Sequence, residues 1–261
     1  MSRRAIPASA AWTAALTYVF LHLPLAILVA FSFNRSRFSV QWKGFTLQWF
    51  ERLAHRPDVL RALRLSIGIG VASTLLATLL GTLLALALAR YTLRGRRVYE
   101  GLLYLPIVTP EIVAGISLLL LFSALGVGLG TATIVIAHTA FSLPFVTVVV
   151  LARMAGMDRA LEEAAMSLGA DELTTFRRVT LPQLLPGIAA AALLAFTLSF
   201  DDFVITFFVA GVGSTTLPLV VYSMVRKSVE PTINAISTIM LVVTTALVWL
   251  AERLSRGSAR G

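Results

Sequence analysis

The sequence has no cysteine, which excludes disulfide bonds, thiol catalysis and thiolate metal sites in this chain. It also lacks G-x-x-x-x-G-K-[ST] and H-E-x-x-H, the patterns of a nucleotide-binding P-loop and of a zinc protease. Its three histidines have no spacing typical of metal ligands. We therefore expect no catalytic residues, no metal and no cofactor in this chain.

Charged residues are scarce as well. They make up 13% of the chain, compared with about 25% in a soluble domain, whereas 57% of the residues are hydrophobic. A membrane-spanning helix needs about 20 mostly apolar residues. Six runs meet this requirement, at 12–31, 65–89, 101–125, 132–152, 185–209 and 232–250. The composition predicts an all-α, polytopic membrane protein that forms one domain over residues 1–261.

The basic residues indicate how these spans are oriented. Lys and Arg cluster between the apolar runs, so the net charge of +9 points to anionic lipid headgroups and not to nucleic acid. Six spans place both termini on one side. The segments of that side, from Arg3 and Arg4 onward, collect thirteen Lys and Arg, against nine on the other side. This bias predicts cytoplasmic termini. Shorter helices are expected at 49–63, on the membrane surface, and at 217–227.

One polar segment, 163–182, stands out between uncharged runs, and its charges must project into water. Good helix formers occupy 161–168, and Gly169 follows them where a left-handed cap is expected. Asp171 suits the N-cap of a second helix that ends at 178. Pro182 then stops that helix or opens the next. The residues alone predict a solvated loop with two short helices.

The spacing of residues in this segment is more specific than a general solvated loop requires. The pattern E-A-A, three residues, G, nine residues, an aliphatic residue, one residue, L-P resembles the signature loop of permease subunits of bacterial ABC importers. Its residues here are Glu163, Ala164, Ala165, Gly169, Val179, Leu181 and Pro182, and Ile is common in place of Val179. The resemblance implies a type I, MetI-like fold and a cytoplasmic coupling loop, 153–184, that docks on an ATP-binding subunit.

All of the signature residues except Val179 are assigned to ATPase coupling on this basis. Glu163 is the residue expected to contact the ATPase. The alternative is an intrahelical ion pair between Glu163 and Arg159, which are spaced for one.

Other stretches of the chain resemble the C-type permease subunit of spermidine/putrescine importers. They are SFNRSRFSVQWKGFTLQWF, PEIVAGISLLLLF, HTAFSLPFV, LSFDDFVITFF and LPLVVYSMVRKSVEPTINA. The resemblance implies a multi-pass subunit of the bacterial inner membrane that moves polyamines by alternating access. Its implied partners are an ATPase dimer that binds ATP and Mg, a different sister permease and an external substrate-binding protein.

Three acids lie within the predicted spans, and acids in that position indicate function by default. Asp201 and Asp202 lie in the fifth span, and Glu111 lies about ten residues into the third, or about 15 Å deep. No Lys or Arg falls in the core of a predicted span. We expect these acids to line a cation pathway, together with aromatic rings that can receive ammonium groups, at Phe200, Phe203 and Tyr222. The alternative is that the acids cap helix kinks or bond the sister subunit.

Other interpretations remain open. The importer could carry ferric iron, thiamine or another organic solute. A membrane enzyme is disfavoured because no nucleophile–base pair or metal cluster accompanies the acids, and a secondary transporter because no inverted repeat is visible. His138 is expected to be a hydrogen-bonded packing residue. Close helix packing is expected at Gly68, Gly70, Gly81 and Gly115.

Overall fold

The computed structural model describes residues 8–36, 41–91, 94–227 and 231–257. The predicted basic residues Arg3 and Arg4, and parts of the polyamine-type stretches at 37–40 and 228–230, lie outside these ranges. The elements are α1 (Ala8–Ser32), α2 (Gln48–Ala54), α3 (Pro57–Arg90), α4 (Arg96–Val108), α5 (Glu111–Ala124), α6 (Thr131–Ala155), α7 (Ala160–Ser167), α8 (Glu172–Thr175), the π-helix η1 (Phe176–Thr180), α9 (Leu181–Asp201), α10 (Val204–Val209), α11 (Leu217–Lys227) and α12 (Pro231–Gly257). The all-α prediction is confirmed.

Five of these helical segments are long and apolar enough to cross a membrane: Ser9–Ser32, Pro57–Arg90, Thr131–Ala155, Glu172–Asp201 and Pro231–Arg253. A sixth span arises only if α4 and α5 are counted together, and these two helices are bent by 110° relative to each other. The cause is local. Pro110 disfavours a helical conformation at the preceding Thr109, which has a ψ of 131°. The third span predicted at 101–125 is therefore present as a bent pair, α4 and α5, and Glu111 is the first residue of α5.

Two other predicted helix boundaries also differ in the structure. The surface helix expected at 49–63 ends at Ala54, because Pro57 begins α3 and is suited to a first helical position. The fifth span, expected to run to Val209, is interrupted after Asp201, and Val204 begins a separate short helix. The helix expected at 217–227 is confirmed as α11.

The chain divides into two compact units, and the first contains residues 1–60 and 221–242. Its loop after α1 is organised by Asn34, which is 1% exposed. The amide of Asn34 donates to the carbonyl of Gln41 at 2.7 Å and accepts from the N–H of Lys43 at 2.8 Å. The indole of Trp49 donates to the carbonyl of Asn34 at 2.7 Å. Trp49 is thus buried, whereas Trp42 is exposed.

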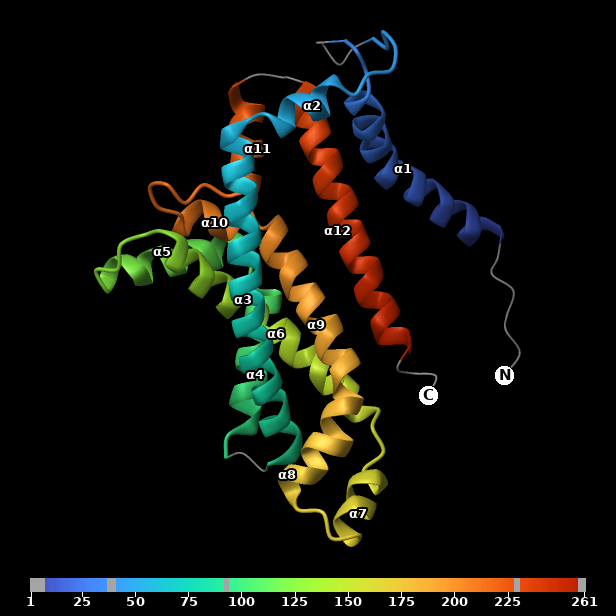
Figure 1. The fold of residues 1–261 in the computed structure, drawn as a ribbon, viewed down its shortest axis with the longest axis vertical. Coiled ribbons are helices and arrows are strands. Elements are labelled where there is room, and N and C mark those ends of the chain that lie inside the picture. The colour runs from blue at the N-terminus through green and yellow to red at the C-terminus, as the bar shows by residue number, and fades with distance from the viewer. Residues whose placement is uncertain (1–7, 37–40, 92–93, 228–230, 258–261) are drawn as a thin grey trace. The chain divides into compact units, whose positions relative to one another are not determined.

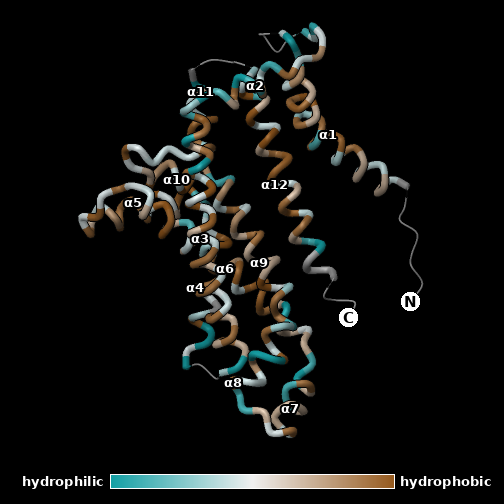
Figure 2. Tube along the Cα trace, viewed as in Figure 1, coloured by the Kyte–Doolittle hydropathy of each residue, from teal (hydrophilic) through white to brown (hydrophobic). Residues whose placement is uncertain are grey.

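The second unit contains residues 61–220 and 243–261, and α6 and α9 lie side by side in it (Figure 1). One buried cluster joins α3, α5, α6 and α10: Ile69, Phe122, Ile134, Ala137, Ile205 and Val209. A second joins α3, α6 and α9: Ala77, Ala85, Val146, Val150, Ala191 and Ala195. Figure 2 shows hydrophobic residues along α3, α6 and α9 and hydrophilic ones around α7 and α8.

Small residues allow this close packing at defined points. A Cβ at Gly81 would lie 2.8 Å from Val146, and one at Gly70 would lie 2.9 Å from the ring of Phe196. A Cβ at Gly115 would lie 2.6 Å from Phe208. The packing predicted at these three glycines is confirmed. At Gly68 it is wrong within this chain, because an added Cβ would meet nothing within 4 Å.

Candidate functional site

The polar loop after α6 turns at Gly169. This residue has a φ of +92°, a conformation in which any side chain would be strained. Its N–H donates to the carbonyl of Met166 at 3.0 Å, and the N–H of Ala170 donates to the carbonyl of Ala165 at 3.1 Å. These two bonds form a Schellman cap at the end of α7. The predicted left-handed cap at Gly169 is confirmed.

Asp171 starts the helical segment that follows. Its Oδ1 accepts from the N–H of Thr174 at 2.8 Å, as predicted for an N-cap. The hydrogen bond from Thr174 favours the charged carboxylate and lowers the pKa of Asp171.

From Glu172 onward the helix does not stop. Elements α8, η1 and α9 follow one another and form one span from Glu172 to Asp201. The prediction of a second loop helix that ends at 178 is therefore wrong, and Pro182 occupies the first turn of α9. Proline has no N–H to donate to a carbonyl four residues back, and the π-helical turn directly before it changes the local register. This is why the helix continues through Pro182.

Glu162 connects this loop to the end of α3. Its Oε1 accepts from the hydroxyl of Thr180 at 2.6 Å and forms an ion pair with the guanidinium of Arg90. The Glu162 side chain is only 14% exposed. Burial raises the pKa of Glu162, but the bond from Thr180 and the ion pair with Arg90 lower it further, so the pKa lies below its ordinary value. Sequence reasoning missed this connection, because Arg90 lies 72 positions away.

A neighbouring bond strengthens the same connection. The guanidinium of Arg159 donates to the carbonyl of Ala89 at 3.4 Å, so it satisfies a free carbonyl at the end of α3. The last two residues of α3 are thus both joined to the beginning of the loop.

The predicted contact residue, Glu163, is placed differently. It is exposed, and its carboxylate makes no ion pair with Arg159 within the described part of the chain, so that alternative is not realised. Ala164 and Pro182 are exposed, and Ala165 and Leu181 are half-buried. The assignment of these residues to ATPase coupling stays a prediction.

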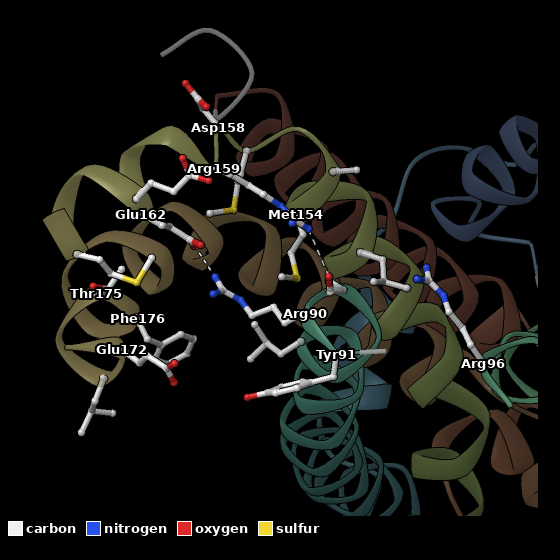
Figure 3. A pocket seen from close by; sticks show the side chains of 18 residues that line it. Arg90, Tyr91, Arg96, Met154, Asp158, Arg159, Glu162, Glu172, Thr175 and Phe176 are labelled. Carbon is white, nitrogen blue, oxygen red and sulfur yellow. Dashed lines mark hydrogen bonds and ion pairs between the residues drawn. The ribbon is translucent and has the colours of Figure 1, made fainter. Parts of the chain in front are cut away.

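A cavity of about 940 Å³ lies between the ends of α3 and α6 and the loop (Figure 3). Figure 3 shows Glu162 directed toward Arg90 across it. Charged residues of both signs line it: Arg90, Arg96, Arg159, Asp158, Glu162, Glu163 and Glu172. Such a mixture favours contact with another charged protein surface over the binding of one small ion.

The acid pair lies at the break between α9 and α10. Asp201 is the last residue of α9, and Asp202, with a ψ of 122°, leaves the helix. The Asp202 carboxylate accepts from the N–H of Ile205 at 3.2 Å and from the N–H of Thr206 at 2.7 Å. Asp202 therefore caps α10, which is the capping alternative that the sequence left open for it.

His138 of α6 completes the arrangement around Asp202. Its Nε2 lies 3.1 Å from Oδ2 of Asp202 and 2.9 Å from Oγ1 of Thr206, while its Nδ1 lies 2.7 Å from Oγ of Ser199. Ser73 of α3 donates to Ser199 at 3.0 Å. His138 is 3% exposed, and the prediction of a hydrogen-bonded, buried residue is confirmed.

Ser199, His138 and Asp202 have the order of a nucleophile, a base and its carboxylate partner. The prediction that no nucleophile–base pair accompanies the acids is therefore wrong. Ser199 is only 6% exposed, however, and its hydroxyl also accepts from Ser73. A substrate carbonyl could reach Ser199 only if the helices separated, so the arrangement favours structure over acyl transfer.

The other predicted pathway residues differ in exposure. Asp201 and Glu111 are exposed, and neither makes an ion pair within the described ranges. Phe200 is buried against Phe196, with ring centroids 5.7 Å apart. Phe203 is half-buried at the helix break.

Tyr222 lies on α11 and already carries a cation on its ring. The guanidinium carbon of Arg226 is 5.7 Å from the ring centroid. The role of each of these residues in a pathway stays a prediction.

The arrangement of spans and loop is that of a known class of membrane protein. A bacterial ABC transporter involved in the import of the acidic polysaccharide alginate contains a chain with a TM-score of 0.72 and 18% identity. The match covers 95% of this chain and 94% of that one. The fold is the MetI-like fold of ABC importer permeases.

The sequence identifies the family. Residues 64–260 match the family described as binding-protein-dependent transport system inner membrane component, and the chain belongs to this family. It is 42% identical over 239 residues to the spermidine/putrescine transport system permease protein PotC of Haemophilus influenzae, covering 92% of this chain and 93% of the relative. It is 41% identical over 233 residues to the putrescine transport system permease protein PotI of Escherichia coli K12, covering 87% and 83%.

Proposed function

We propose that this chain is one permease subunit of an ATP-driven importer that carries polyamines across the bacterial inner membrane. The observation that carries the proposal is its sequence identity to two polyamine permeases along nearly the whole length of each chain. Alternating access is the proposed mechanism, with both termini in the cytoplasm.

The chemistry of the acids is consistent with a cationic solute. Asp201 and Glu111 are exposed carboxylates at helix ends, next to apolar helices and without an ion pair in the part of the chain that the structure describes. A polyamine carries ammonium groups that could pair with them in turn. Asp202 is engaged by α10 and His138, so we assign solute contact to Asp201 rather than to Asp202. Phe203, two positions from Asp201 and half-buried, is the ring that could assist.

The energy would come from partner chains. ATP and Mg are proposed to bind an ATPase dimer, which Glu163 and the neighbouring alanines contact from the loop. A different permease would complete the pathway, and an external binding protein would deliver the solute. Since Glu162 and Arg90 fix α7 to α3, a push on the loop would reach the spans directly.

The test is ATP-dependent uptake of labelled spermidine into vesicles that contain the whole complex and its binding protein. Unlabelled putrescine should suppress uptake, whereas ferric iron and thiamine should not. Asp201→Asn should reduce uptake, and Glu51→Gln, a matched change on α2, should not. If the complex hydrolyses ATP in response to its loaded binding protein but takes up no polyamine, the importer class stands and the solute assignment fails.

A further inference from the structure

His138 differs from the other histidines of the chain in where its bonds go. His22 and His55 each bond the carbonyl four residues earlier in their own helix, at 2.8 Å. His138 instead uses both ring nitrogens for partners on other elements: Ser199 of α9 on one side, and Asp202 and Thr206 at the start of α10 on the other. One buried imidazole thus joins α6 to both sides of the helix break.

The hydrogen bonds around the ring also define its protonation pattern. The hydroxyl of Thr206 donates to Asp202 at 2.7 Å, so its proton is already used. Nε2 of His138 must then be the donor toward Asp202, and Nδ1 is free to accept from Ser199. Ser73 donates to Ser199 in turn. A ring with a proton on Nε2 fits the partners on both of its sides.

We propose that His138 is a positioning residue for the solute pathway: it fixes the helix break and thereby the direction in which the neighbouring Asp201 carboxylate is presented. This rests on the proposed role of Asp201 as the acid that meets the solute. Asp202 keeps its bonds to Ile205 and Thr206 when His138 is absent, so α10 still has its cap. What is lost is the link between that cap and α6.

The C-terminal end of α10 is bonded to α6 independently of His138, so the effect of losing His138 is confined to the other end. The hydroxyl of Thr133 on α6 donates to the carbonyl of Val209 at 2.8 Å. Loss of His138 therefore removes the hydrogen-bonded link at the end of α10 next to Asp201, while the packing of Ile205 and the bond of Thr133 remain. The expected change is local to the break and does not extend to the fold of the unit.

Two amide variants separate the two sides of the ring. In His138→Gln, the longer side chain can place its NH₂ group near the position of Nε2 and keep the bond to Asp202. In His138→Asn, the shorter one can place its carbonyl near Nδ1 and keep only the bond to Ser199. His138→Phe removes both. Ser142→Ala is the matched control, because Ser142 lies one turn later on α6, is 1% exposed, and its hydroxyl has no partner within the described ranges.

The readout is the reactivity of a cysteine placed at Asp201. The chain has no cysteine of its own, so Asp201→Cys gives one site of modification in this subunit. The rate of its reaction with a cationic, water-soluble methanethiosulfonate is measured in the whole complex by mass analysis of this subunit. We expect His138→Phe and His138→Asn to change the rate by about tenfold, whereas His138→Gln and Ser142→Ala stay within about twofold of the parent.

Equal rates in the Asn and Gln variants, or a rate in the Phe variant equal to that of Ser142→Ala, would overturn the proposal. If the Phe variant does not assemble, the Asn and Gln pair decides. Uptake of spermidine by the native complex is measured in parallel. Its absence would refute the polyamine assignment, while the labelling rates would still show whether His138 positions residue 201.

Discussion

Arg90, the last residue of α3, forms an ion pair with Glu162 of α7 and not with the neighbouring Glu163. The two adjacent acids therefore have different environments. Glu162 is enclosed by Arg90 and Thr180, whereas Glu163 is exposed. Glu162 holds the loop in place, and Glu163 remains accessible to solvent.

The first prediction concerns the charge of Glu162. Glu162→Gln should lower the free energy of unfolding by about 1 kcal/mol at neutral pH, since the pair is partly exposed and screened. The pKa of Glu162 is lowered in the folded chain, so this stabilisation is present above the unfolded pKa of about 4.3 and is lost as the pH falls through the folded pKa. The measurement is thermal unfolding of the purified complex from pH 7 downward.

Glu163→Gln is the control, and it should leave unfolding unchanged. The difference between the native protein and Glu162→Gln should shrink toward acidic pH. A difference that grows instead would contradict the assigned role of the carboxylate.

The second prediction concerns the turn at Gly169. Gly169→Ala should cost about 1–2 kcal/mol, because a Cβ at a φ of +92° is strained even though it would meet no atom within 4 Å. Gly169→Asn should cost less, since Asn tolerates this conformation better. Gly101→Ala, in α4 and also without a neighbour, should be neutral or slightly stabilising. Thermal unfolding of the three variants, with ATP-driven uptake alongside, would show whether the cap is needed.

The third prediction concerns helix packing in α3. Gly81→Ala places a Cβ 2.8 Å from Val146 and 3.1 Å from the carbonyl of Leu143, in a core with no space. We expect a loss of about 1–3 kcal/mol. Gly68→Ala lies in the same helix with nothing nearby and should not destabilise the isolated subunit. The measurement is thermal unfolding of the two variants in detergent. Equal losses of stability in Gly81→Ala and Gly68→Ala would argue against the α3–α6 contact.

The fourth prediction separates the two adjacent acids. Asp202→Ala leaves the N–H groups of Ile205 and Thr206 and the ring of His138 without their acceptor, and should destabilise the subunit by about 3 kcal/mol. Asp201→Asn should change stability by less than about 0.5 kcal/mol. It should nevertheless reduce polyamine uptake at least about tenfold, the equivalent of one lost ion pair of about 1.4 kcal/mol.

Thermal unfolding and uptake on the same preparations test this pair of variants. If Asp201→Asn unfolds as readily as Asp202→Ala, Asp201 has a structural role and its assignment to the pathway fails.

Part of the fold and of the loop could be predicted from the sequence, for physical reasons. The spans follow from hydropathy, and the cap at Gly169 and the N-cap at Asp171 follow from local conformational preference. The breaks at Thr109 and Asp202 were missed as helix ends, because Pro110, Glu111 and the two aspartates interrupt apolar runs that are still long enough to be counted as single spans.

The hydrogen bonds of Glu162 and His138 could not be predicted from the sequence for a different reason. Arg90 and Ser199 lie 72 and 61 positions from their partners. No spacing rule connects residues so far apart. Only the packing of α3, α6 and α9 brings them together.

The continuous helical segment from Glu172 to Asp201 connects the loop to the acid pair. Its 30 residues correspond to about 45 Å, with the loop at one end and the acid break at the other. Because one continuous helical segment joins them, we expect the loop and the break to move together and not in sequence. Spin labels at the two ends should keep a constant separation through the ATP cycle.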